Sequence, residues 1–96
     1  MSQYITIHDL SSGTAAYQTI STSTTSQQST AITARRIMMT TGNLTHYVQF
    51  GTSPVVTTGN GFVIPSNTSM LFNFRTGDKV AVIATAASSC SIVDLD

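Results

Sequence analysis

Short stretches in which apolar and polar residues alternate recur along this chain, and each ends near a glycine, asparagine, serine or proline. Alternation with a period of two places one set of side chains on each face of a β-strand. A helix would need an apolar stripe at three- and four-residue spacing. The longest helix-tolerant stretch, residues 31–39, has no such stripe and contains β-branched residues. The chain is therefore predicted to be all-β.

About eight short strands are predicted. The clearest covers residues 70–74, where Met70, Phe72 and Phe74 face one way. Segment 22–28 is polar and fits either a long edge strand or a loop. Many short strands at regular spacing are typical of an antiparallel β-sandwich, and eight is the number in a jelly roll. The predicted strands are 3–8, 15–21, 31–40, 45–50, 62–64, 70–74, 79–84 and 89–95.

Three further patterns refine this prediction. Strands 79–84 and 89–95 carry apolar residues on both faces, which is expected of central or subunit-covered strands. The turn at 76–78 contains Gly77, which tolerates positive φ. Sequons begin at Asn43 and Asn67, and both are interpreted as turn residues.

The composition limits the partners that the chain can have. Only 8% of the residues are charged, glutamate is absent, and serine and threonine supply 30 of the 96 residues. A net charge of zero argues against a nucleic-acid partner and against a basic membrane-surface segment. It also leaves little electrostatic self-repulsion, which favours assembly. We expect one domain over residues 1–96, with residues 1–10 as an N-terminal arm or edge strand.

No segment has the pattern of a secretory signal or the length of an apolar membrane span. The chain is therefore expected to be made in a cytosol and to work outside it, a combination that virion proteins of bacterial viruses show.

The search for catalytic chemistry gives little. Cys90 is alone and is interpreted as a buried small thiol. His8 and His46 are far apart and are interpreted as surface or hydrogen-bonded histidines. The four aspartates include two in the last three residues, and a chain terminus positions carboxylates poorly for glycoside hydrolysis. No catalytic residue, metal ligand or cofactor site is predicted, and a cupin-like enzyme would need clustered histidine and glutamate.

The remaining polar and aromatic candidates point to association. Arg35 and Arg36 form the only basic pair, and on a strand they would point to opposite faces, so one of them is expected at a rim, at an interface or beside a carboxylate. A second charged group surrounds the turn at 76–78. The candidate subunit or capsid interface residues are Tyr4, Arg35, Arg36, Arg75, Asp78 and Lys79.

Three segments carry a resemblance to a known family. The segments "HYVQFGTSP" at 46–54, "FVIP" at 62–65 and "GDKVAVI" at 77–83 resemble a group of small virion-associated proteins of tailed bacteriophages. The match covers roughly residues 15–95. In the related pattern a proline precedes the Gly-Asp of the last motif, and here Thr76 stands in its place.

The resemblance implies a jelly-roll-like β-sandwich with a structural role. Such proteins sit on the capsid exterior as trimeric decoration (cement) proteins, with the major capsid protein and their own copies as partners. They also occur as modules of fibres and tail-associated appendages, and a host-recognition module that binds glycan is therefore the alternative. A separate small enzyme is the third hypothesis.

Overall fold

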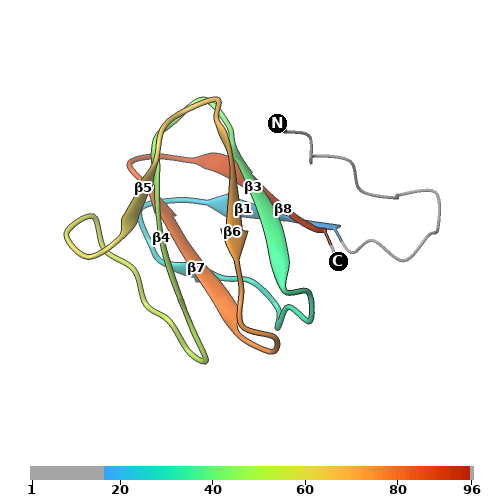
Figure 1. Ribbon diagram of the computed structural model, residues 1–96. Helices are drawn as coiled ribbons and strands as arrows, with labels where there is room; N and C mark the ends of the chain where they lie inside the picture. Colours follow the sequence, from blue (N-terminus) through green and yellow to red (C-terminus); the bar gives the residue numbers. More distant parts are fainter. Residues whose placement is uncertain (1–16, 96) are drawn as a thin grey trace.

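The computed structural model describes residues 17–95, and these residues form two antiparallel four-stranded sheets and no helix. The predicted all-β sandwich is thus confirmed (Figure 1). Because this part of the chain has no helix, it holds no long apolar helix of the kind that crosses a membrane. The strands are β1 (Tyr17–Thr22), β2 (Gln27–Gln28), β3 (Arg36–Thr41), β4 (His46–Gly51), β5 (Phe62–Ile64), β6 (Ser69–Asn73), β7 (Lys79–Ala84) and β8 (Ser88–Asp94).

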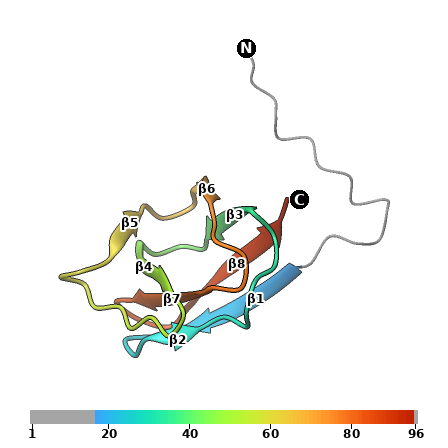
Figure 2. The same cartoon turned by 60° about the horizontal axis from the view of Figure 1, so that its bottom comes forward.

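The strand order is that of a jelly roll. One sheet has the order β1-β8-β3-β6 and the other β2-β7-β4-β5. The first strand pairs with the last, the second with the seventh, the third with the sixth and the fourth with the fifth. The chain is therefore one long hairpin, and rolling it up adds the pairs β3–β8 and β4–β7. Figure 2 shows β5 and β6 together at one side of the sandwich and β1 and β2 at the other.

The core lies between the two sheets. Every second residue along a strand points into it. On β3, Ile37 and Met39 are buried while Met38 between them is half-buried, as predicted. Strands β7 and β8 lie inside their sheets, which confirms the prediction that they are central. The main core cluster comprises Ile20, Ile32, Ala34, Ile37, Met39, Val48, Ile64, Phe74, Val80, Val82, Cys90 and Ile92.

A loop covers the outer face of the β2-β7-β4-β5 sheet. Val56, in the long connection between β4 and β5, is buried against Ala81 and Ile83 of β7, with Tyr47 packed beside them. The Val56 N–H donates to Ser26 Oγ at 3.2 Å, which fixes the loop to the edge of this sheet. Strand β7 is apolar on both faces because one face meets the other sheet and the other face meets this loop.

The strand set differs from the prediction in two places. Residues 3–8 lie outside the described residues, and the eighth strand comes instead from segment 22–28, as the two-residue edge strand β2. Strand β3 begins at Arg36 rather than at residue 31. The backbone before it is bonded elsewhere: the Ile32 N–H donates to Asp78 O at 2.9 Å, and Ile32 O accepts from the Gly77 N–H.

The turn at 75–78 carries the chain from one sheet to the other. The Asp78 N–H donates to Arg75 O at 3.1 Å, and Gly77 has a φ of 94°, the left-handed conformation predicted for it. Asn67 also has positive φ, at 52°, and Asn43 accepts a hydrogen bond from Ser88 Oγ, so both sequons lie at turns as interpreted.

Candidate interaction surface

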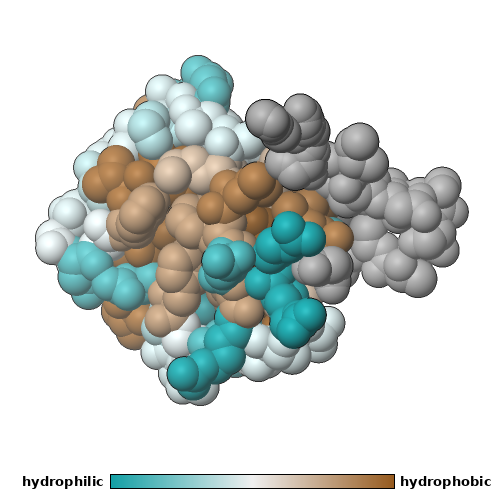
Figure 3. Space-filling view, in the orientation of Figure 1, coloured by the Kyte–Doolittle hydropathy of each residue, from teal (hydrophilic) through white to brown (hydrophobic). Residues whose placement is uncertain are grey.

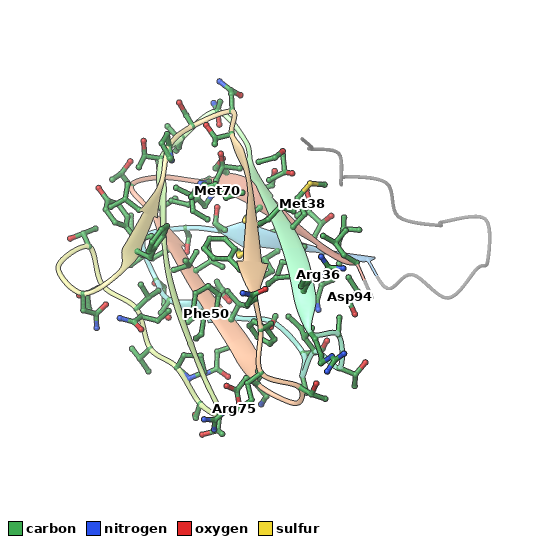
Figure 4. All side chains as sticks on the ribbon, viewed as in Figure 1. Arg36, Met38, Phe50, Met70, Arg75 and Asp94 are labelled. Carbon is green, nitrogen blue, oxygen red and sulfur yellow. The ribbon has the colours of Figure 1, made fainter. Side chains whose placement is uncertain are left out.

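All the charged side chains that the structure describes lie at one end of the sandwich. We call this group the charged end, and it consists of Arg35, Arg36, Arg75, Asp78, Lys79 and Asp94. The four basic residues are all that the whole chain contains. Figure 4 shows Arg36, Asp94 and Arg75 toward this end of β3, β8 and β6.

Strand pairing brings these residues together from distant parts of the sequence. The Phe74 N–H donates to Arg35 O at 2.7 Å, so the basic pair lies beside the 75–78 turn. Arg36 is the register partner of Asn73 on β6. Arg35 precedes β3, and both arginines are exposed, so neither is forced into the core as strict alternation would require. Of the other candidates from the sequence, Tyr4 lies outside the described residues.

Asp94 is a partly buried carboxylate of the charged end. It is the register partner of the buried Ile37, so it sits on the inner row at the last position of β8. Burial disfavours the ionised form and raises the pKa of Asp94 above its ordinary value. Since the folded state then holds this proton more firmly than the unfolded state, folding is favoured most at low pH and loses stability as pH rises through the window between the two pKa values.

Replacing Asp94 by asparagine is expected to remove this loss. The free energy of unfolding of the wild type should fall relative to that of Asp94→Asn as pH rises through that window. Urea unfolding at a series of pH values measures this, and the difference should persist in high salt, because salt screens Coulomb interactions but not desolvation. Parallel pH curves for the two proteins would contradict the assignment.

An apolar band crosses the side of the molecule where β5 and β6 lie (Figure 3). Phe62 on β5 is 50% exposed, Leu71 on β6 51% and Phe50 on β4 37%. Half-buried residues connect them. We define the apolar band as Phe50, Phe62, Met70, Leu71, Phe72 and Met38.

Aromatic contacts hold the part of the band that lies between the sheets. The Phe72 ring is 5.2 Å from Phe50 and 5.5 Å from Phe62, centroid to centroid, and Phe50 meets Phe74 edge-on at 5.6 Å. Tilted and edge-to-face pairs are favourable arrangements for aromatic rings. Phe50 faces the core side but stays partly exposed, because the sandwich is open between its β5 and β6 edges.

The band continues onto the outer face of the β1-β8-β3-β6 sheet. Leu71 pairs with Met38, and Met38 pairs with Val93 on β8, so these three residues form one row across the strands. The next row toward the uncharged end consists of hydroxyl side chains, with Thr40 bonded to Ser69 at 2.8 Å. The band therefore has a hydroxyl border on one side and the charged end on the other.

The buried histidine is a structural group. His46 is fully buried, and its Nδ1 lies 2.8 Å from the carbonyl oxygen of Leu44. A carbonyl only accepts, so Nδ1 carries the proton and Nε2 accepts from Thr22 Oγ1 at 2.9 Å. The interpretation of His46 as a hydrogen-bonded histidine is confirmed, whereas His8 lies outside the described residues.

The Thr22–His46 bond is expected to contribute measurably to stability. Thr22→Val leaves Nε2 buried without a donor, at a cost of about 1–3 kcal/mol in the free energy of unfolding. Thr40→Val, which removes a hydroxyl from an exposed pair, should change it by no more than about 0.5 kcal/mol. Chemical unfolding of both variants gives the comparison, and equal losses would contradict the stated role of the buried bond.

Cys90, the cysteine of the chain, is enclosed in the core. Its side chain is fully buried, and burial raises the pKa of its thiol to about 12. The thiol therefore stays protonated at neutral pH, and the interpretation of Cys90 as a buried small thiol is confirmed. Within residues 17–95, no group of three or more histidine, cysteine or acidic residues is arranged to hold a metal ion.

Comparison with known proteins finds no relative of this chain. No protein-family model matches the chain, and searches of curated proteins and of solved structures give no match.

The segments that carry the phage resemblance fall together in the structure. They form β4, β5 and β7, which are three of the four strands of one sheet. Their apolar residues supply Val48, Ile64, Val80 and Val82 to the core. Their role within the fold is therefore packing. They contribute Phe50 and Phe62 to the apolar band, whose other four residues come from the other sheet.

Proposed function

We propose that this chain is a structural virion protein, a capsid decoration (cement) protein that binds the outer surface of a tailed-phage head and stabilises it. Its partners under this proposal are the major capsid protein and further copies of itself, in a homotrimer. The protein is made in the host cytoplasm and acts on the capsid exterior, without catalytic residues or cofactor. The observation that carries the proposal is the apolar band on a small neutral domain.

The band has the composition of an interface rather than of an ordinary surface. Interfaces are enriched in aromatic residues, methionine and arginine, and their centres are depleted of most other charged residues. Three phenylalanines, two methionines and Leu71 form the band, and the arginines of the charged end lie beside it. A domain of 96 residues gains little by leaving such a surface exposed to water.

The role of a decoration protein also requires no catalytic group. A protein that binds assembled capsomers but not their separated subunits stabilises the assembled state by mass action. Symmetric repetition of one contact on the shell multiplies that effect. Such a role needs a rigid fold and a complementary surface, and the resemblance of segments 46–54, 62–65 and 77–83 to small phage virion proteins agrees with it.

Binding to phage heads that lack the protein tests the proposal. The purified wild type should co-sediment with such heads and raise their resistance to heat. Phe62→Ser removes an exposed ring from the band and should reduce occupancy at least tenfold, a loss of about 1.4 kcal/mol in binding free energy. Val55→Ser is the matched control, because Val55 is 66% exposed but lies in the connection between β4 and β5 and is not part of the band.

Binding to glycan instead of to phage heads would favour the alternative function, a host-recognition module. Binding of the isolated protein to a glycan array, together with no binding to heads, would mean a host-recognition or fibre-associated module. Equal loss in Phe62→Ser and Val55→Ser would mean that the band is not the contact surface.

A further inference from the structure

Strand β6 has a free edge. It lies at the end of the β1-β8-β3-β6 sheet and pairs only with β3 among the described strands. The Phe74 N–H donates to Arg35 O, so alternate residues from Phe74 back along the strand direct their backbone toward β3. The backbone N–H and C=O groups of Ser69, Leu71 and Asn73 therefore point away from the sheet.

This edge lacks the features that normally prevent pairing with another chain. Natural edge strands are protected by charged side chains, proline, bulges or very short length. The sequence of β6, Ser-Met-Leu-Phe-Asn, has no charge and no proline. The edges of the other sheet are shorter, since β2 has two residues and β5 has three and is followed by Pro65.

Exposed aromatic side chains lie just inside the same edge. Phe72 and Met70 point to the inner side of β6 and are only half-buried, and the rings of Phe50 and Phe62 beside them are exposed. A strand added to β6 would continue the sheet and place every second side chain over these rings. One extended segment with an apolar face could therefore pair with the free edge and cover the aromatic part of the apolar band.

The chain itself contains a segment of that kind. If residues 3–8 form a strand, the alternation of the sequence places Ile5 and Ile7 on one side and Tyr4, Thr6 and His8 on the other. The segment is one residue longer than β6, and it carries no acidic or permanently basic side chain. With Thr6 opposite Leu71, the two isoleucines fall opposite Met70 and Phe72.

We propose that residues 3–8 of one copy add as a strand to the β6 edge of a neighbouring copy, with Ile5 and Ile7 covering the exposed rings. This deepens the proposed function by naming the contact that holds copies together, and it rests on the self-association in that proposal but not on capsid binding. Main-chain hydrogen bonds supply the affinity and the isoleucines supply the specificity.

The sheet order decides what assembly results. The donor segment precedes β1, and β1 and β6 are opposite edges of the same sheet. Each copy therefore donates at one edge and accepts at the other, a head-to-tail contact that closes into a ring when the rotations between successive copies add up to a full turn. A closed ring of three agrees with the homotrimer.

Exchange between copies is favoured over insertion into the same copy. The edge beyond β6 is about 19 Å from β1, four strand spacings away, and residues 9–16 can span about 26 Å. Within one copy, that linker would have to cross Val93 and Met38 with Asp9, Ser11 and Ser12 against apolar side chains. Between copies the linker needs no such crossing.

Disulfide trapping in the full-length protein tests the contact directly. Thr6→Cys is combined in turn with Ser69→Cys, Leu71→Cys and Asn73→Cys, so that one pair matches whatever register the strand adopts. The natural Cys90 is fully buried and does not compete. Mild oxidation should link copies to one another, and the product should reach three times the 10.2 kDa of one chain.

Matched variants establish which face of the segment matters. Ile7→Lys should convert the oligomer to monomer at micromolar concentration, measured by light scattering, whereas Thr6→Lys on the opposite face should leave it assembled. A disulfide formed within one chain would overturn the exchange between copies. Absence of any disulfide, or an oligomer unaffected by Ile7→Lys, would overturn the contact. Heads are not needed for these measurements, so their failure is distinguishable from a failure of capsid binding.

Discussion

Replacing Ile92 by alanine is expected to lower the free energy of unfolding by about 2–5 kcal/mol, the range for large-to-small changes in a packed core. Ile92 is fully buried on β8, the central strand that pairs with both β1 and β3. The alanine removes apolar contacts and leaves a cavity that neighbours on two strands cannot close without breaking their pairing. Urea unfolding of wild type and variant gives the difference.

Val93→Ala is the matched control for Ile92→Ala. Val93 is the next residue of the same strand, but it is half-buried on the outer face. Its truncation should cost less than about 1 kcal/mol unless the outer face is covered in solution. A larger loss for Val93 than for Ile92 would contradict the register, because a shift by one residue exchanges the two faces.

The second large effect is expected at Gly61, where β5 begins and the covering loop ends. A Cβ at this position would lie 2.6 Å from the Cβ of Tyr47 and 2.8 Å from a methyl carbon of Val56. Neither atom is the free end of a flexible side chain, so the loop would have to lift from the sheet. Gly61→Ala is therefore expected to cost about 1–3 kcal/mol, as overpacking does.

Gly59→Ala separates this clash from the general effect of losing a glycine. Gly59 lies in the same loop, and the nearest atom to an added Cβ is Thr57 Oγ1 at 3.8 Å, an ordinary contact. We expect no loss of stability there. Thermal unfolding and limited proteolysis of the 52–61 loop measure both variants. Equal behaviour of the two would mean that the loop does not lie against the sheet.

The sequence predicts most of the fold because the alternating pattern is local. Strands 62–64 and 79–84 are found where they were predicted, and 70–74 is displaced by one residue. Strand β2 was left open because Gln27 and Gln28 carry no pattern of burial, and their strand conformation depends on pairing with β7, more than fifty residues away.

The candidate surface was predicted less well, for a related reason. The turn at 76–78 was predicted from its local sequence, Thr76-Gly77-Asp78. Arg35 joins it only through the backbone bond to Phe74, which no local pattern reveals. The apolar band was also missed. Its aromatic part is exposed because β5 and β6 are both edges on the same side of the sandwich, and its other part lies on the outer face of the β1-β8-β3-β6 sheet.

The number of copies in the virion tests the central claim most directly. Under the proposed function the chain is encoded by a tailed phage, and quantitative mass spectrometry of that phage's purified virions would give the ratio of this chain to the major capsid protein. A decoration protein should be present in hundreds of copies, in a fixed ratio to the capsid protein. A dozen copies or fewer would contradict decoration and place the chain in a tail or fibre.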